Sequence, residues 1–300
     1  MVPQLCLAVD IGGTKLAAGL VDGRGRLLER RAVATPRGRD PEALFSVLRA
    51  LVDDVQRLAL TEGHGRAVVC GVGCGGPMAP EGVTVSPLNI PAWRDFPLRD
   101  RMGQATGLPV AVDNDGKALA LGEGWVGAAR GCRNFLAMVV STGVGGGVVV
   151  DGRLLDGAAG NAGHVGHVIV EPEGRRCGCG ARGCLEAEAS GTAIEAITGR
   201  PAAEAPPEVV ARTGQLVGRA VASVSVLLDL PLTVVAGSVA LGFGAPFFAA
   251  AHAELAERAR LAFARSARIV PAGLGPTGPL VGAGAVGWRA VGHEVIGGAA

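Results

Sequence analysis

Residues 5–28 read LCLAVDIGGTKLAAGLVDGRGRLL, and residues 135–155 read FLAMVVSTGVGGGVVVDGRLL. Each stretch holds an apolar run, a glycine-rich turn, a second apolar run and a hairpin signal in which VDGR precedes a Leu-Leu pair. The two stretches begin about 130 residues apart, and self-similarity at such a distance predicts an internal duplication. The alternative is chance, because glycine-rich hairpins of this kind are common.

Length and composition narrow the class of protein. Three hundred residues fit one large domain or two ordinary ones. The formal net charge of +1 offers no basic surface for a nucleic-acid backbone, so we expect no nucleic-acid partner. The chain is 49% hydrophobic and 18% charged, which excludes a disordered chain, and its 49 glycines indicate tight turns or close approach to a ligand.

Strand and helix patterns alternate along both halves and predict an α/β protein with two lobes. The first lobe is expected over residues 1–116, joined by a closing helix at 288–300, and the second over 117–287, with a loop at 164–186. No segment rich in Ser, Pro or charge separates them, so we expect the lobes to touch and to hinge around a cleft.

Membrane and export signals are weak. The apolar start meets Asp10 at once and has neither a basic beginning nor a cleavage site, which does not fit a secretory signal. Leu230 to Ala251 is uncharged and long enough to cross a bilayer, but its glycines and prolines favour a strand, a turn and the start of a helix. The sequence therefore predicts a cytoplasmic protein without a membrane partner.

Two glycine loops follow apolar strands, at Asp10–Thr14 and Ser141–Gly147. Glycines let backbone N–H groups converge on an anion, and a Thr hydroxyl adds a donor, which is what a polyphosphate requires. Neither loop matches the P-loop pattern or the dinucleotide pattern GxGxxG before a helix. Either loop alone could be a plain turn, but two in a duplicated frame predict a nucleotide between the copies.

Asp113-Asn114-Asp115 lies where a predicted strand ends and a helix begins. Asn114 or Asp115 could simply cap that helix. Beside two phosphate loops, however, a carboxylate at the end of a strand is typical of a general base for a hydroxyl nucleophile. We therefore predict that Asp115 is the catalytic base, oriented by Asn114.

His167 and the run Cys177-Gly-Cys179-Gly-Ala-Arg-Gly-Cys184 supply one imidazole and three thiols. Three Cys and one His are the donors of a closed tetrahedral zinc site, and four protein ligands leave no position open for chemistry. The alternative, three free surface thiols, is chemically hazardous. The sequence predicts a structural Zn²⁺ that fixes the loop carrying His164, His167 and Glu186. The remaining four cysteines lie in or beside apolar runs and are expected to be buried small side chains.

Taken together, these motifs resemble the ROK family of repressors and sugar kinases. The resemblance covers almost the whole chain: DxGGT at Asp10–Thr14, the family's E-N-D at Asp113–Asp115, STGxGGG at Ser141–Gly147, and GH…CxCGxxGCxE over Gly166–Glu186, with a looser match at Val235–Val239. It implies an actin-like, hexokinase-like ATPase fold, that is, duplicated ribonuclease H-like domains with a central cleft and a zinc-binding loop.

The family's activity would be transfer of the γ-phosphate of ATP to the 6-hydroxyl of a hexose or N-acetylhexosamine. The resemblance implies Mg²⁺ near Asp10, with Asp115 as base. Expected sugar ligands are Asn89, Asn114, His164, His167 and Glu186; expected nucleotide ligands are Asp10, Gly12, Gly13, Thr14, Lys15, Thr142, Gly143 and Gly237. A homodimer or homotetramer is expected by analogy. Only nine residues precede Asp10, so we expect no DNA-reading winged helix.

The chain departs from the family pattern at a few positions. Asp113 replaces the usual Glu, and Gly116-Lys117 replaces a small Ala-Asn pair. His164 stands where the family's glucokinases have Glu. A neutral His offers one donor and one acceptor, which favours a sugar with an amide carbonyl. The pattern is similar to bacterial N-acetylmannosamine kinases, so N-acetylmannosamine or glucose is the expected substrate. The alternative is a sugar-binding regulator without turnover.

Overall fold

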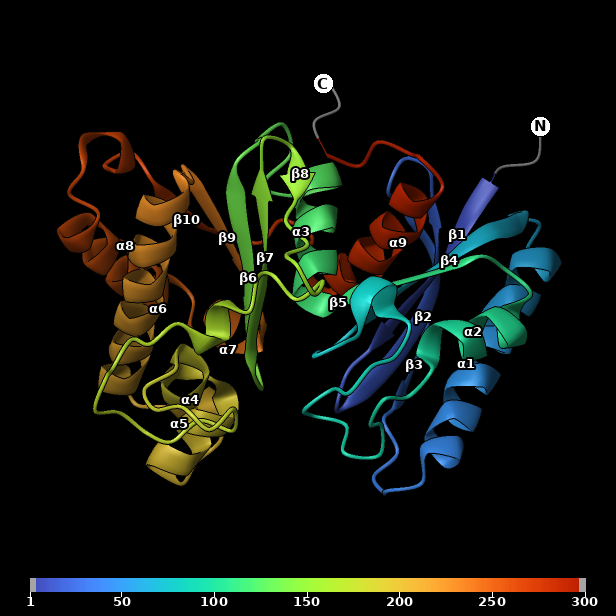
Figure 1. Ribbon diagram of the computed structural model, residues 1–300, viewed down its shortest axis with the longest axis horizontal. Coiled ribbons are helices and arrows are strands. Elements are labelled where there is room, and N and C mark those ends of the chain that lie inside the picture. Colours follow the sequence, from blue (N-terminus) through green and yellow to red (C-terminus); the bar gives the residue numbers. More distant parts are fainter. Residues whose placement is uncertain (1–3, 297–300) are drawn as a thin grey trace. The chain divides into compact units, whose positions relative to one another are not determined.

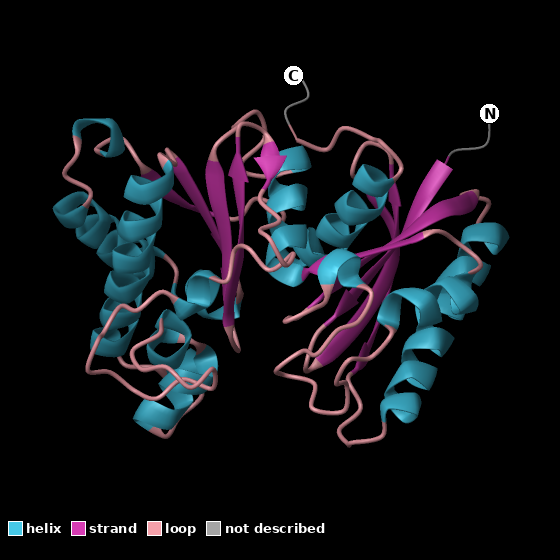
Figure 2. Cartoon of the chain, viewed as in Figure 1, coloured by secondary structure: helices cyan, strands magenta, loops and turns pink. Residues whose placement is uncertain are grey.

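Two five-stranded sheets organise residues 4–296, the part of the chain that the computed structural model describes (Figures 1 and 2). They belong to two units. Among the described residues, unit 1 comprises 4–131, 156–162 and 274–296, and unit 2 comprises 132–155 and 163–273. Each unit buries its own hydrophobic core between its sheet and its helices.

The sheet of unit 1 has the order β3-β2-β1-β4-β5. β1, β2 and β3 form an antiparallel meander, whereas β4 and β5 run parallel to β1. The strands are β1 (Gln4–Ile11), β2 (Lys15–Asp22), β3 (Leu27–Ala34), β4 (Arg66–Cys74) and β5 (Val110–Asn114). Because β1, β4 and β5 are parallel, their carboxyl ends meet at one edge of the sheet.

The helices of unit 1 are α1 (Pro41–Thr61), α2 (Leu98–Thr106), α3 (Asp115–Val126) and α9 (Gly278–Ala290). Asp40 caps α1, since its carboxylate accepts the N–H of Glu42 at 2.9 Å. α1 and α9 cover opposite faces of the sheet. α9 comes so close to β4 that a Cβ on Gly71 would lie 2.0 Å from the carbonyl oxygen of Ala283, so only glycine fits there.

The sheet of unit 2 has the order β10-β9-β6-β7-β8. Here too the first three strands in the chain are antiparallel, and the last two run parallel to the first of them. The strands are β6 (Phe135–Val140), β7 (Val144–Val150), β8 (Arg153–Leu154), β9 (Leu232–Ala236) and β10 (Arg268–Pro271). The two sheets share one topology, which confirms the predicted duplication.

The helices of unit 2 are α4 (Leu185–Ala189), α5 (Gly191–Thr198), α6 (Pro207–Leu228), α7 (Ser238–Phe243) and α8 (Ala245–Arg258). α6 and α8 pack against each other. Single 3₁₀ turns occur at Pro80–Gly82, Val165–His167, Ala202–Glu204, Ala262–Ala264 and Gly275–Thr277. The uncharged stretch from Leu230 forms β9, α7 and the start of α8, and no helix within residues 4–296 is both long and apolar enough to cross a bilayer.

Some predicted boundaries differ from the structure. Where a strand, a turn and the start of one helix were expected from Leu230, the structure has a short helix, α7, before α8, with a break at Gly244. The expected glycine turn at 141–147 ends at β7, which begins at Val144. The closing helix is Gly278–Ala290 rather than 288–300, of which 297–300 lie outside the described residues. The lobe boundary drawn at 116 would cut α3, which packs against α9, so the whole helix belongs to unit 1.

Candidate functional site

Two acidic side chains approach each other at the carboxyl edge of the unit 1 sheet. Asp10 is on β1, and Asp115 begins α3 directly after β5. Between them β4 places Gly73, which is in register with Asp10 and whose Cβ, if present, would lie 3.9 Å from the Cα of Asp115. Because Gly73 has no side chain, β4 places no side chain at this position between β1 and the start of α3.

The electrostatics of Asp10 reflect this arrangement. Burial raises the pKa of Asp10 to about 7, the negative charge of Asp115 adds to the rise, and Lys15 opposes it. The buried thiol of Cys74 lies in the same field, and burial together with the two aspartates raises its pKa well above the ordinary value. A bound cation would relieve this repulsion.

Asn114 is the residue that caps α3. Its Oδ1 accepts the N–H of Gly116 at 2.9 Å, and Oδ1 of Asp115 accepts the same N–H at 2.8 Å. The carbonyl end of the Asn114 side chain is therefore committed to the helix. Its amide group is the end that remains suited to a ligand hydroxyl.

The first glycine loop is closed by its own backbone. The N–H of Gly12 donates to the carbonyl of Lys15 at 3.0 Å, and Thr14 and Lys15 are exposed at the tip. Asn89 lies over this loop, because a Cβ on Gly13 would lie 2.9 Å from the Asn89 carbonyl oxygen. Unit 1 thus gathers the predicted residues Asp10, Asn89 and Asp115 with the loop at residues 12–15.

The second glycine loop, in unit 2, is held by residues that sequence reasoning missed. Thr192 donates its hydroxyl to the carbonyl of Thr142 at 3.0 Å, and the hydroxyls of Ser141 and Ser238 are 2.9 Å apart. Gly237 precedes Ser238 with φ 103°, and a Cβ there would meet the Val140 carbonyl at 2.2 Å. Three segments around Thr142, Thr192 and Gly237 therefore form one cradle. The position of Ser238, directly after a strand and a glycine, could have identified it as a residue of this cradle. Thr192 has no comparable sequence pattern around it.

The predicted sugar residues of unit 2 adjoin this cradle. Oε2 of Glu186, on α4, accepts the N–H of Val144 at 2.9 Å, and it lies 2.8 Å from where a Cβ of Gly143 would be. The rings of His164 and His167 are nearly parallel, with centroids 6.1 Å apart. Glu186 is thereby tied to the glycine loop, and the two histidines present their rings side by side.

The predicted metal ligands converge. Nδ1 of His167 and the sulfurs of Cys177, Cys179 and Cys184 all lie within 4.8 Å of one another. The distances from Cys177 to His167 Nδ1 and from Cys179 to Cys184 are both 3.7 Å. These separations suit four ligands around one zinc ion with Zn–S bonds of about 2.3 Å. Because Nδ1 of His167 faces the thiols, its Nε2 remains for a ligand, so both predicted roles of this residue are compatible.

We expect the titration of Asp10 to shape stability. The folded protein holds this proton far above the ordinary Asp pKa of 3.8, so stability falls as pH rises from about 4 to about 7. In Asp10→Asn this loss should disappear. Between pH 4 and pH 8 the free energy of unfolding of the variant should therefore rise relative to that of wild type by up to about a few kcal/mol. Urea unfolding of the ligand-free proteins at both pH values measures this. Asp53→Asn on α1 is the surface control, and parallel pH profiles for wild type and Asp10→Asn would contradict the expectation.

We expect the purified protein to hold one zinc ion per chain and Cys184→Ser to lose it. Since such an ion is tied to folding, the variant's Tm should fall by about 5 °C or more. Elemental analysis and thermal unfolding measure the two effects. Cys132→Ser is the matched control, because that thiol donates to the Asn134 carbonyl at 3.2 Å outside the cluster. Retention of zinc by Cys184→Ser would show that the cluster is not the metal site.

Known proteins are similar to this chain in both sequence and structure. The family model described as "ROK family" matches residues 6–288. An N-acetylmannosamine kinase of Citrobacter koseri is 40% identical over 255 residues, which cover 79% of this chain and 84% of the relative. Among solved structures, the ROK hexokinase from Thermus thermophilus has a TM-score of 0.79 at 34% identity, covering 96% of this chain and 99% of the other.

A ROK family glucokinase from Streptomyces griseus, solved in complex with glucose and AMPPNP, has a TM-score of 0.82 at 31% identity, covering 95% of this chain and 99% of the other. The family match spans both sheets, both glycine loops and the cysteine cluster. This chain therefore belongs to the ROK family.

Proposed function

We propose that this chain is an ATP-dependent sugar kinase that phosphorylates the 6-hydroxyl of an N-acetylhexosamine or hexose, N-acetylmannosamine or glucose foremost. One observation carries the proposal: the Asp115 carboxylate begins α3 beside largely buried Asp10, at the edge where the first glycine loop leaves the sheet. The related N-acetylmannosamine kinase of Citrobacter koseri and the Streptomyces griseus glucokinase support the reaction class.

Asp115 is the proposed general base. Its carboxylate would accept the proton of the sugar hydroxyl, the hydroxyl oxygen would bond to the γ-phosphorus, and the bond from that phosphorus to the bridging oxygen of ADP would break. Asn114, which caps α3, fixes the direction in which that helix begins. Phosphoryl transfer depends more on positioning and charge neutralisation than on covalent chemistry, so a rigid helix start suits this base.

Two loops are the proposed phosphate ligands. Gly12, Gly13, Thr14 and Lys15 offer backbone N–H groups, a hydroxyl and an ammonium, whereas Thr142, Gly143 and Gly237 line the cradle of unit 2. The oxygens of Asp10 are ligands that Mg²⁺ prefers, and the raised pKa of Asp10 shows a carboxylate that a divalent cation would stabilise in its charged form. When bound with ATP, Mg²⁺ would supply charge neutralisation at the phosphates.

The sugar ligands proposed are Asn89, Asn114, His164, His167 and Glu186. Oε2 of Glu186 already accepts from Val144, which leaves its other oxygen for a sugar hydroxyl. The imidazole of His164 offers an N–H donor, and such a donor fits an N-acetyl carbonyl. The names of the curated relatives support N-acetylmannosamine ahead of glucose.

The alternative, a sugar-binding regulator without turnover, would need neither a base at residue 115 nor two glycine loops. A coupled assay of ADP release across a panel of sugars tests the proposal. Sugar-dependent ADP release with at least one of them supports a kinase. Sugar binding without any ADP release would identify a regulator instead.

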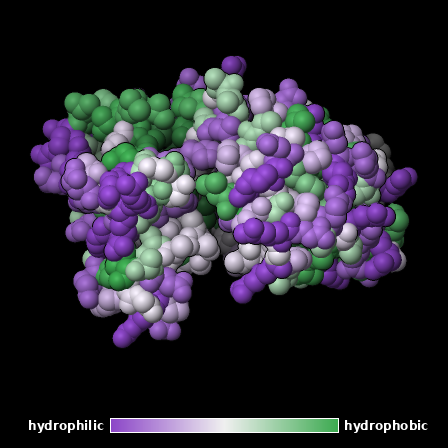
Figure 3. All heavy atoms as spheres, turned by 60° about the horizontal axis from the view of Figure 1, so that its bottom comes forward, coloured by the Kyte–Doolittle hydropathy of each residue, from purple (hydrophilic) through white to green (hydrophobic). Residues whose placement is uncertain are grey.

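We also propose a cytoplasmic homodimer or homotetramer. Large hydrophobic side chains are exposed on unit 2 at Leu227, Leu261 and Phe263. On the face drawn in Figure 3, hydrophobic residues gather toward one end, which is the kind of surface that self-association buries.

We expect Asp115→Asn to bind sugar and ATP but to turn over about 10²–10⁴-fold more slowly, because the amide cannot accept the hydroxyl proton. Asparagine keeps the size and the capping geometry of the aspartate, so the fold should be unaffected. Steady-state kinetics together with calorimetric sugar binding separate the two effects. Turnover near the wild-type rate would remove Asp115 from the mechanism.

We expect His164→Glu to shift preference from N-acetylmannosamine toward glucose. A carboxylate accepts from two hydroxyls but cannot donate to an amide carbonyl, and the loss of one buried hydrogen bond changes discrimination by about tenfold or more. The measurement is the ratio of kcat/KM for the two sugars. An unchanged ratio in a variant that still turns over would discredit His164 as the specificity residue.

A further inference from the structure

Lys117 is a buried charge two residues beyond the proposed base. Its side chain is 2% exposed, and its Nζ donates to Oδ1 of Asp156 at 2.8 Å and to the carbonyl of Gly160 at 3.0 Å. Oδ1 of Asp113, near the end of β5, lies 3.4 Å from the same nitrogen. An ammonium has three N–H donors, so these three acceptors account for all of them.

Asp156 and Gly160 belong to a short segment, residues 156–162, which we call the strap. The strap is part of unit 1, although the chain on both sides of it belongs to unit 2. A second anchor holds its far end, where the amide of Asn161 donates to the carbonyl of Met78 at 3.0 Å and accepts the Met78 N–H at 3.2 Å. The strap is therefore fastened to unit 1 near both of its ends.

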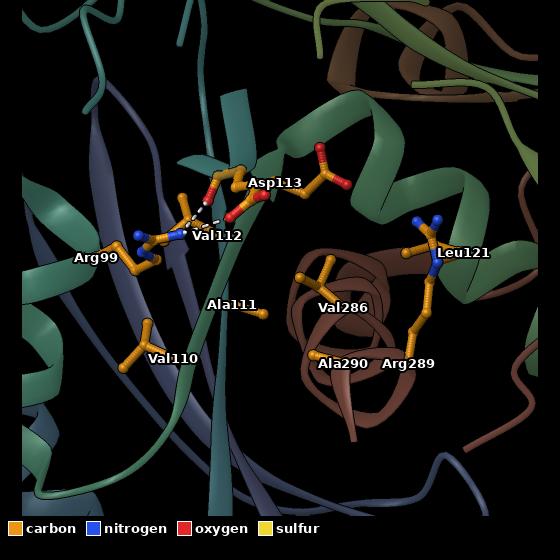
Figure 4. A pocket seen from close by; sticks show the side chains of 10 residues that line it. Arg99, Val110, Ala111, Val112, Asp113, Leu121, Val286, Arg289 and Ala290 are labelled. Carbon is orange, nitrogen blue, oxygen red and sulfur yellow. Dashed lines mark hydrogen bonds and ion pairs between the residues drawn. The ribbon is translucent and has the colours of Figure 1, made fainter. Parts of the chain in front are cut away.

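A third contact of the strap is much more exposed. Oδ2 of Asp156 lies 3.4 Å from Arg289, whose side chain is 41% exposed. Arg289 and Asp113 border a cavity of about 300 Å³ along β5 and α9 (Figure 4). Asp156 itself is 53% exposed, so its ion pair with exposed Arg289 contributes little. Lys117, by contrast, is buried, and its ammonium also donates to the Gly160 carbonyl, so loss of that ammonium leaves buried acceptors without their donor. Lys117 and Asn161 are therefore the anchors that matter.

The strap joins two functional neighbourhoods through the chain. Lys117 follows Asp115 by two residues on α3, and the strap ends at Ala162, two residues before His164. We propose that Lys117 is a positioning residue that, through the strap, fixes where His164 is presented to the sugar. This inference rests on the proposed function and names the residue that tunes its specificity.

The physical reason is preorganisation. A loop held in place before the sugar arrives does not have to be ordered by the sugar, so binding is tighter. If the strap is released, only a fraction of molecules present His164 correctly, and the apparent sugar affinity falls by that fraction. Affinity for ATP should not change, since neither anchor belongs to the glycine loops.

The experiment compares three variants of the full chain. Lys117→Met keeps a long apolar stem without the ammonium, and Asn161→Ala removes the other anchor away from α3. If the strap is then ordered about one tenth of the time, both variants raise the sugar Kd and KM about tenfold while ATP KM stays within about twofold. Arg289→Gln is the matched control and leaves the sugar Kd unchanged.

Two readouts separate positioning from general damage. In both anchor variants the preference for N-acetylmannosamine over glucose should narrow, and amide exchange at Gly160 and Ala162 should accelerate, because their N–H groups donate within the strap at 3.3 and 3.0 Å. Zinc content should match wild type. If Lys117→Met folds poorly, Asn161→Ala still allows the same comparison with wild type.

The outcomes distinguish the two proposals. Unchanged sugar Kd and sugar preference in both anchor variants, or a fall in kcat alone, would overturn the positioning role. Wild-type protein that binds sugar without ADP release would contradict the kinase proposal only, and the sugar Kd comparison would still decide the role of Lys117. Wild-type protein that binds no sugar would overturn both.

Discussion

Repulsion between two acidic groups at one sheet edge is the constraint around which unit 1 is built. Parallel pairing of β1, β4 and β5 brings Asp10 and the residues after β5 to the same edge, and glycine at position 73 leaves Asp10 and Asp115 facing each other. Burial raises the pKa of Asp10 to about 7, with Asp115 adding to the effect. Two negative charges in a low-dielectric site store electrostatic energy that a cation or an incoming proton releases. Phosphoryl transfer brings both: magnesium with the nucleotide and a proton from the acceptor hydroxyl.

Unit 2 repeats the sheet but equips it differently. Where unit 1 has carboxylates at its strand ends, unit 2 has hydroxyl groups at the ends of β6 and β9, on Ser141 and Ser238. Donors suit phosphates, and carboxylates suit a metal and a proton, so the two copies of the sheet carry different chemistry at their strand ends. The cysteine cluster brings His167 close to Cys184, the residue directly before α4, and therefore close in the chain to Glu186.

Sequence patterns predicted most of this where the signal is local. The repeated strand–glycine–strand stretch indicated the duplicated sheets, Asn114 marked a helix start, and the Cys spacing located the candidate metal cluster. Contacts between distant segments were not predicted: Thr192, which carries no local signal, reaches Thr142 across 50 residues, and Ser238 reaches Ser141 across 97. The high glycine content indicated tight turns or close approach to a ligand, but several glycines instead allow two elements to pack closely. A Cβ on Gly282, for example, would lie 2.5 Å from the Ala118 carbonyl, so glycine lets α9 contact α3.

Two departures from the family pattern, at Asp113 and at Gly116-Lys117, also show which contacts a local pattern predicts and which it does not. Asp113, near the end of β5, and Lys117, in the first turn of α3, are only four residues apart, so their contact is local in the sequence. The contact with Asp156, 39 residues further on, is not. A buried ammonium is costly unless each of its three N–H donors makes a hydrogen bond. Lys117 therefore needs two acceptors besides Asp113. The burial of Lys117 therefore requires the strap to be in place, so a residue whose neighbours on α3 are local constrains a segment 39 residues further along the chain.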